Sequence, residues 1–181
     1  YDALNDLYEE GATFEQARSM FEPIGPVIRK YMPIAAENPA DDSFLHAEWD
    51  QSKLRDVTAT VVEQVGFDFN RGRLDLCGNA FCARPGGMND VRMTTRPSGH
   101  FKGVVSSSLH EMGHALYEQK QRQEWGHLPI ATGVSLAVHE SQSRLWENVI
   151  GRSHPFWSFF YARYQNAFSN LSPVSLDTFW K

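Results

Sequence analysis

The chain has 181 residues, of which 41% are hydrophobic and 22% are charged, and its formal net charge is −5. This length suits a single domain with a sizeable core, and we expect residues 1–181 to form one. No block of Lys or Arg could track a phosphate backbone, and no apolar run approaches the roughly 18 residues of a membrane span. The composition therefore predicts neither a nucleic-acid nor a membrane partner.

Two cysteines, Cys77 and Cys82, are too few for a disulfide-dependent scaffold or for a cysteine zinc site. The first residues are acidic and lack the basic-then-apolar order of a secretory signal. Both observations predict a cytoplasmic protein with reduced thiols. The chain opens inside a helical pattern and ends on an aromatic run, so we expect it to be a portion of a longer protein.

The first part of the chain is helical by pattern. Residues 4–10 predict the end of a helix, closed by Gly11. Thr13 and Gln16 have capping-box spacing and predict a helix from Phe14 to about Glu37, which Gly25-Pro26 must kink or break. After a loop at residues 38–42, a further helix is expected from Asp50 to Val65, with Leu54, Val57, Val61 and Val65 on one stripe.

The pattern then changes to that of strands and returns to helix. Residues 73–77 and 90–95 alternate polar and apolar side chains, which is typical of half-buried strands, and residues 83–87 form a turn-rich loop between them. Helices are expected at residues 103–121 and 136–150, followed by an aromatic helix from Phe156 to Tyr164. The predicted class is mainly α with one small antiparallel β-sheet.

The chemistry is concentrated in residues 110–114, His-Glu-Met-Gly-His. Positions four apart stand about 40° apart around a helix, so His110 and His114 face the same way and can share one metal ion. Glu111 lies on an adjoining face, where it can reach a metal-bound water. The alternative is a pair of ordinary helix histidines, because this short motif also occurs by chance.

A third ligand decides between these alternatives, since a catalytic zinc takes three protein ligands and keeps one position open. Glu140 follows His110 by thirty residues on a second predicted helix, and the segment between them is rich in loop residues. A His, His, Glu set is a known catalytic zinc arrangement. The predicted mechanism is attack of a zinc-bound water on a peptide carbonyl, with Glu111 as the base that accepts and then donates the proton.

With these residues established, the chain resembles the Taq-type thermostable carboxypeptidases, a family of metal-dependent exopeptidases. Three motifs match in order: Asp90-Val91-Arg92-Met93-Thr94, residues 110–118, and residues 139–144. The resemblance spans essentially the whole chain. The resemblance implies a helical metallopeptidase core, release of C-terminal residues from peptides, Zn²⁺ or Co²⁺ dependence and a homodimer. Family members are more than twice as long, so residues 1–181 are expected to be the catalytic-core portion.

The sequence departs from the family pattern at one place. Asn79-Ala80-Phe81 stands where the family has His-Pro-Phe, whose histidine is thought to help bind substrate. Asn79 can still donate and accept hydrogen bonds but cannot carry charge. A second hypothesis is therefore a truncated or diverged relative that binds metal with little peptidase activity, and a third is a helical interaction module in which the motif is incidental.

Several further residues keep two interpretations. His139 contacts substrate or makes a structural hydrogen bond. Arg92 binds the terminal carboxylate of a substrate, for which the arginine fork is suited, or forms a salt bridge with Asp90 or Glu140. Arg144 and Glu147 orient a metal-bound imidazole or are surface charges. The aromatic run from Phe156 to Tyr164 is core, or is partly exposed and promotes self-association.

Overall fold

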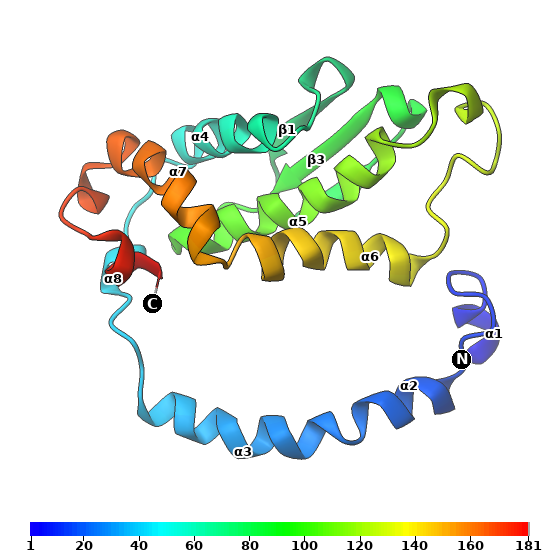
Figure 1. Cartoon of the computed structure of the whole chain (residues 1–181), viewed down its shortest axis with the longest axis horizontal. Coiled ribbons are helices and arrows are strands. Elements are labelled where there is room, and N and C mark those ends of the chain that lie inside the picture. Colours follow the sequence, from blue (N-terminus) through cyan, green and yellow to red (C-terminus); the bar gives the residue numbers. More distant parts are fainter. Residues whose placement is uncertain (181) are drawn as a thin grey trace. The chain divides into compact units, whose positions relative to one another are not determined.

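The computed structural model describes residues 1–180 and confirms a mainly helical fold with a small sheet (Figure 1). Among these residues, no helix has the length and apolar content needed to cross a membrane. The helices and strands in chain order are α1 (Asp2–Asn5), α2 (Phe14–Phe21), α3 (Ile24–Glu37), α4 (Gln51–Gln64), β1 (Gly72–Leu76), β2 (Phe81–Ala83), β3 (Val91–Thr95), α5 (Phe101–Gln119), α6 (Leu136–Arg144), α7 (His154–Ala167) and α8 (Leu176–Trp180).

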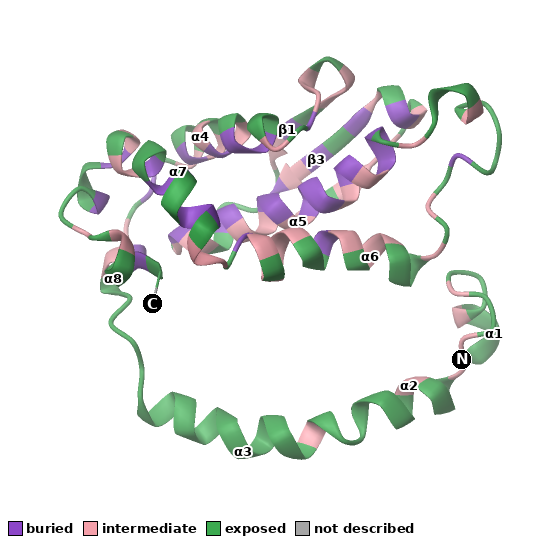
Figure 2. Ribbon diagram, in the orientation of Figure 1, coloured by how far each residue is buried: buried purple, intermediate pink, exposed green. Residues whose placement is uncertain are grey.

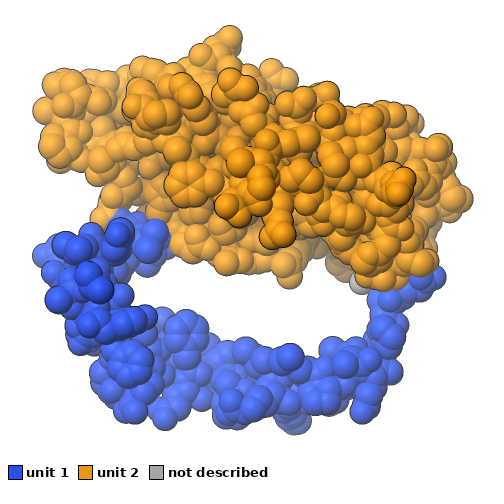
Figure 3. All heavy atoms as spheres, turned by 180° about the vertical axis from the view of Figure 1, so that it is seen from behind, with its two compact units in different colours: residues 1–41, 135–137 blue, residues 42–134, 138–181 orange. Residues whose placement is uncertain are grey.

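The chain divides into two compact units, which Figure 3 colours separately. The first comprises residues 1–41 and 135–137, and the second comprises residues 42–134 and 138–181. Helices α1, α2 and α3 of the first unit contain no buried residue, as Figure 2 shows. The buried core described below belongs to the second unit. A single domain over residues 1–181 stays a prediction.

The predicted capping box of α2 is confirmed, but two predicted helix boundaries are wrong. Gln16 N–H donates to Thr13 Oγ1 at 3.2 Å, and Thr13 N–H donates to Gln16 Oε1 at 2.9 Å. The break expected at Gly25-Pro26 lies earlier, before Ile24, and Pro26 falls in the first turn of α3. Proline is tolerated there because its missing N–H would have no partner within the helix. The helix expected to reach residue 10 ends at Asn5.

The sheet is mixed, which corrects the expected antiparallel pairing. Its order is β1-β3-β2, with β3 parallel to β1 and antiparallel to β2. The strand missed by the sequence is β2, whose three residues are too few to show alternation. Because the chain reverses into β2 and reverses again into β3, the two predicted strands run in the same direction. Strand β3 is therefore central and packs against α5 (Figure 1).

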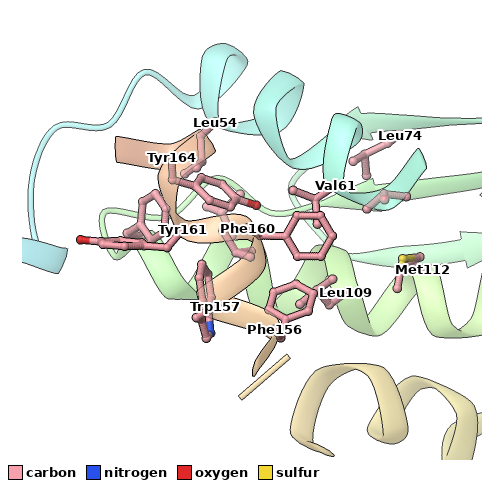
Figure 4. Close-up of a cluster of buried hydrophobic side chains, with 14 of the residues drawn as sticks. Leu54, Val61, Leu74, Leu109, Met112, Phe156, Trp157, Phe160, Tyr161 and Tyr164 are labelled. Carbon is pink, nitrogen blue, oxygen red and sulfur yellow. The ribbon is translucent and has the colours of Figure 1, made fainter. Parts of the chain in front are cut away.

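The core of the second unit gathers side chains from α4, α5, α7 and the sheet (Figure 4). Leu54 and Val61 of α4 meet Leu109 and Met112 of α5 there, and each is at most 1% exposed. The aromatic helix is mainly core, because its side chains except Phe159 line this cluster: Phe156, Trp157, Phe160, Tyr161 and Tyr164 are buried, whereas Phe159 is 62% exposed. This core fixes α5, the helix that carries the HExxH motif.

We predict that Leu54→Ala lowers the free energy of unfolding by about 2–5 kcal/mol, because it leaves a cavity beneath α7 in a close-packed core. Urea denaturation followed by circular dichroism measures the loss. Leu4→Ala is the matched control, since Leu4 is 66% exposed and its truncation is expected to change stability by less than about 0.5 kcal/mol. Equal effects of the two substitutions would contradict this account of the core.

Candidate metal centre

Helix α5 presents the two histidines of the motif side by side, as their four-residue spacing predicts. The ring centroids of His110 and His114 lie 4.9 Å apart with an interplanar angle of 78°. Their side chains are 18% and 12% exposed, so both rings are largely shielded but reachable. Glu111 lies between them in sequence and is only 7% exposed.

Helix α6 brings Glu140 to these two rings. Its Oε2 lies 3.3 Å from His114 Nε2 and 3.7 Å from His110 Nε2. One ligand atom from each of the three residues falls within 4.8 Å of the others. Bonds of about 2.0–2.2 Å from a zinc ion to nitrogen and oxygen ligands span such separations. The structure thus brings together the three residues that the sequence selects as ligands.

The approach of α6 to α5 depends on Gly113. A Cβ atom at this position would lie 2.5 Å from Ser143 Cα and 2.6 Å from the Gln142 carbonyl oxygen, which are backbone atoms of α6. Ser143 is fully buried, and it follows Glu140 by three residues, or about one helical turn. The middle of the motif therefore needs glycine, because any side chain would separate the helix of the third ligand from the first two.

The hydrogen bond of His110 selects the ring nitrogen that faces Glu140. His110 Nδ1 lies 2.9 Å from Glu147 Oε2, so a carboxylate accepts the Nδ1 proton and leaves the Nε2 lone pair free. Glu147 comes from a π-helical segment, Leu145–Ile150, that continues α6. A π-helical turn shifts the register of the side chains that follow it. Arg144 also donates to Glu147 Oε2 at 3.1 Å and to Glu140 Oε1 at 2.9 Å.

His114 is oriented through a chain of polar side chains. His139 Nδ1 lies 2.6 Å from His114 Nδ1, and His139 Nε2 lies 2.8 Å from Glu118 Oε1. With Glu118 accepting the Nε2 proton of His139, His114 donates its Nδ1 proton to His139 and keeps its Nε2 lone pair toward Glu140. Burial, then the neighbouring His139 and His110, lowers the pKa of His114 to about 4. His114 is thus a neutral imidazole near pH 7.

Both ring nitrogens of His139 are engaged within the protein, which favours the structural alternative for this residue. Its ring stacks on His114 with centroids 4.6 Å apart, and a Cβ at Gly133 would meet it at 2.8 Å. Glu118 is anchored by Arg84, whose Nε lies 3.1 Å from Oε2. That contact is an ion pair without hydrogen-bond geometry, so Glu118 Oε2 accepts no hydrogen bond from residues 1–180.

Glu111 is held as a buried carboxyl beside the candidate ligands. Burial raises its pKa above the ordinary value, and the nearby carboxylates of Glu140 and Glu147 add to this rise, whereas His110 and His139 oppose it. Within residues 1–180, no Arg or Lys pairs with Glu111. A carboxyl in such surroundings takes up a proton more readily than an exposed one, which is the property of a general base that must later return the proton.

Arg92 and Asn79, the other two predicted site residues, lie on or beside the sheet. Arg92 Nε and its terminal nitrogen donate to the two oxygens of Asp90 at 2.7 and 2.8 Å, so its fork is already occupied. Asn79 is exposed and lines a cavity of about 630 Å³ together with Arg96 and Ser107. Ser107, one of the residues that line this cavity, precedes Glu111 on α5 by four residues, or about 6 Å along the helix axis.

Neither Glu118 nor Arg84 was recognised as a site residue from the sequence alone. Glu118 lies one turn beyond His114 on α5, but its partner His139 comes from α6, and only the fold shows that they meet. Arg84 sits in the loop after β2 and bonds the Ala131 carbonyl at 2.7 Å. Burial, with Glu111 and Glu118 nearby, raises the pKa of the Cys82 thiol to about 12, which disfavours the nucleophilic thiolate.

The geometry defines a metallopeptidase-type centre, and comparison with known proteins identifies the family. The profile of the Carboxypeptidase Taq (M32) metallopeptidase family matches residues 1–181, and the chain belongs to this family. It is 40% identical over 170 residues to thermostable carboxypeptidase 1 of Pyrococcus furiosus, covering 89% of this chain and 33% of that protein. It is 38% identical over 185 residues to thermostable carboxypeptidase 1 of Thermus thermophilus, covering 99% of this chain and 36% of that protein.

A solved structure agrees with the sequence matches. The crystal structure of the M32 carboxypeptidase from Deinococcus radiodurans superposes with a TM-score of 0.92 at 35% identity, over 99% of this chain and 36% of that chain. The chain thus spans about a third of the length of the relatives it matches. The family assignment implies a divalent metal.

We predict that Gly113→Ala weakens zinc binding at least about tenfold, because the new methyl group displaces α6 and with it Glu140. Isothermal titration of the metal-free chain with Zn²⁺ measures the change. Gly103→Ala is the matched control on the same helix, since its nearest neighbour is the flexible Ser98 side chain at 3.2 Å. Unchanged zinc affinity in Gly113→Ala would contradict the proposed role of this contact.

We also predict that the metal-free Glu111→Gln variant is more stable than the wild type at neutral pH. The pKa of Glu111 is higher in the folded chain than its value of about 4.3 in the unfolded chain. The wild type therefore loses stability as the pH rises from the unfolded-state pKa to the folded-state pKa. Melting temperatures in EDTA between pH 4 and 8 test this, and the gap between variant and wild type should widen with pH. Glu63→Gln, at an exposed position of α4, should show no such trend. A gap that narrows as the pH rises would refute the prediction.

Proposed function

We propose that this chain is the catalytic core of a metal-dependent carboxypeptidase that releases C-terminal residues from peptides. The observation that carries the proposal is the convergence of His110 Nε2, His114 Nε2 and Glu140 Oε2, with the buried carboxyl of Glu111 beside them. The names of the relatives support the reaction class. Peptide substrates follow from the same proposal.

Zinc is the metal that this donor set fits best, and cobalt is the alternative. Two neutral imidazoles and one carboxylate form a known catalytic zinc set, and three protein ligands leave one position open. Each histidine already has a partner for its Nδ1 proton, so both Nε2 lone pairs are available. A bound zinc ion would supply Lewis acidity and lower the pKa of a coordinated water to about 7.

Glu111 is proposed to act as the general base. Its raised pKa favours uptake of a proton from the attacking water, and the same carboxyl then donates that proton to the leaving amine. Its burial limits exchange of the proton with bulk water. Glu147 and His139 are proposed as positioning residues that hold the rings of His110 and His114 in the tautomer that binds metal.

Substrate binding is proposed at the cavity lined by Asn79. Of the two predicted substrate contacts in this region, Arg92 is already paired with Asp90, whereas Asn79 is exposed to the cavity. Arg96 lines the same cavity and makes no ion pair within residues 1–180, so its guanidinium is available for the terminal carboxylate of a peptide. In this proposal Arg92 stabilises strand β3 through its salt bridge with Asp90. His139 hydrogen-bonds to the ligand His114 and does not contact the substrate.

A second candidate function is a diverged relative that binds metal with little peptidase activity. Asn79-Ala80 in place of the family His-Pro favours it, because Asn79 cannot carry charge.

Both cysteines are free thiols, which favours the proposed cytoplasmic location. The homodimer implied by the family remains a proposal.

We predict that Glu111→Gln retains zinc but lowers kcat by about 10²–10⁴-fold, because the amide cannot accept the proton of the attacking water. Metal analysis and peptide hydrolysis are measured on the same preparations. Glu140→Ala is the companion variant and should lose the zinc equivalent of this centre together with activity. A zinc-loaded Glu111→Gln protein with wild-type kcat would refute the assigned base, and wild-type zinc content in Glu140→Ala would remove the third ligand.

Hydrolysis of a peptide with a free C-terminus, compared with its amidated counterpart, separates the two candidate functions. A carboxypeptidase hydrolyses a peptide with a free C-terminus and leaves its C-terminally amidated counterpart intact, and products identified by mass spectrometry show whether single residues are released. Zinc binding without hydrolysis of either peptide would favour the diverged relative. Restoring His-Pro at positions 79 and 80 should then recover turnover.

A further inference from the structure

A second group of metal-type side chains lies at the N-terminal end of α5. It consists of Asp42, His46 and His100, and one ligand atom from each lies within 4.8 Å of the others. Asp42 Oδ2 is 3.3 Å from His46 Nε2 and 3.8 Å from His100 Nε2, and the two ring centroids are 4.7 Å apart. These residues are distinct from those of the centre described above.

The backbone holds this group in place without the help of an ion. A 3₁₀ turn at Ser43–Leu45 puts Asp42 and His46 on one side, and an isolated antiparallel bridge pairs His46 with His100. Gln51 fastens the same two segments, because its amide donates to the Ser98 carbonyl and accepts from Ser98 N–H. The backbone of these two segments is therefore held in place in advance.

The packing beneath this group is equally firm. Leu45 and Trp49 are 3% and 5% exposed, and the Trp49 ring lies 5.0 Å from that of Phe101, the first residue of α5. Residues on either side of the group are thus anchored in the core. The three polar side chains above them are left at the surface, where an ion can reach them: Asp42 is 54%, His46 57% and His100 33% exposed.

The three side chains do not form a closed hydrogen-bonded set. Asp42 lies within hydrogen-bond distance of His46, but its 3.8 Å separation from His100 exceeds that distance. The nearby cation, Lys102, is directed elsewhere, because its Nζ donates to the Phe179 carbonyl and lies over the Phe179 ring.

We propose that Asp42 Oδ2, His46 Nε2 and His100 Nε2 bind a second divalent transition-metal ion. Two imidazoles and a carboxylate are the ligands that zinc, cobalt and nickel favour. The Asp42 carboxylate balances part of the charge of the ion, and the exposed side is open to water as a fourth ligand. This site is independent of the proposed peptidase activity.

Metal binding requires a change of proton position at both histidines. His46 Nε2 donates to Asp42 Oδ2 at 3.3 Å, so coordination through this atom moves its proton to Nδ1. His100 Nδ1 accepts from Gly103 N–H at 3.3 Å as the N-cap of α5, which places the ring proton on Nε2. Coordination through Nε2 moves that proton to Nδ1 and ends this hydrogen bond. Gly103 N–H keeps a partner, because it also donates to the His100 carbonyl at 3.0 Å. The ion would then link residues 42–46 to the start of α5 and stabilise the folded chain by mass action.

Zinc stoichiometry of the purified chain tests the proposal. We expect about two equivalents of Zn²⁺ in the wild type by isothermal titration and metal analysis, and about one in His46→Ala and in His100→Asn. The asparagine retains an N-cap oxygen for α5, so loss of metal in that variant is separated from loss of the helix cap. His110→Ala should also bind about one equivalent, and the double variant His46→Ala/His110→Ala none.

His127→Ala is the control for weak binding to surface histidines, since His127 is exposed and belongs to neither group. It should retain both equivalents. Circular dichroism in EDTA should match the wild type for every variant, and added zinc should raise the melting temperature of His110→Ala but not of the double variant. A wild type that binds one equivalent, or a second equivalent that persists in His46→Ala, would overturn the proposal.

Discussion

The candidate centre depends on the contact between α5 and α6 at Gly113. Two ligands lie on one helix and the third on another, so the separation of the helices sets whether one ion can reach all three. At Gly113 the backbone of α6 occupies the space that a side chain would fill. Ser143, the buried residue at this contact, is about one turn from Glu140, so little flexibility remains between the contact and the ligand. The site therefore depends on the absence of a side chain at Gly113 as much as on the identity of the three ligands.

The charges around this contact independently favour a cation. Glu111, Glu118, Glu140 and Glu147 converge there, while both candidate histidine ligands have their Nε2 lone pairs free and Glu111 has no basic partner within residues 1–180. Arg144 and Arg84 offset part of this negative charge. Burying unpaired carboxylates is costly unless positive charge compensates them. A divalent ion held by the two Nε2 atoms and Glu140 would supply that charge at the point where these groups meet.

The sequence predicted the parts of the structure that depend on local pattern. Helical periodicity located α4 and α5, and the four-residue spacing predicted that His110 and His114 face the same way, as their rings do. Glu140 could be selected because its residue type completes a known ligand set. Features that depend on non-local packing were missed or misjudged. Strand β2 is too short to show a period, and without it the sheet seemed to have one antiparallel pair.

The partners of the site residues were hidden from the sequence for the same reason. Glu118 and His139 meet only because α5 and α6 pack together, and Asp42 meets His100 only through a bridge between segments more than fifty residues apart. Arg92 carried two interpretations because an arginine on a strand suits a carboxylate ligand or a neighbouring aspartate equally well. In the structure Arg92 makes a bidentate pair with Asp90, which favours the salt-bridge interpretation. Sequence spacing therefore identifies ligands on one helix, whereas the residues that orient them require the fold.

The two groups of metal-type ligands differ in ways that set their order of filling. At the HExxH group, Glu147 and His139 fix the tautomer of each imidazole before an ion arrives, and the ring side chains are less than a fifth exposed. At the second group, His100 must exchange its ring proton and give up a helix cap, and Asp42 and His46 are more than half exposed. Preorganised, shielded ligands bind an ion more tightly than exposed ligands that must rearrange. We therefore expect the HExxH group to fill first and the second group to fill only at higher metal concentration, where its ion would link residues 42–46 to the helix that carries the first.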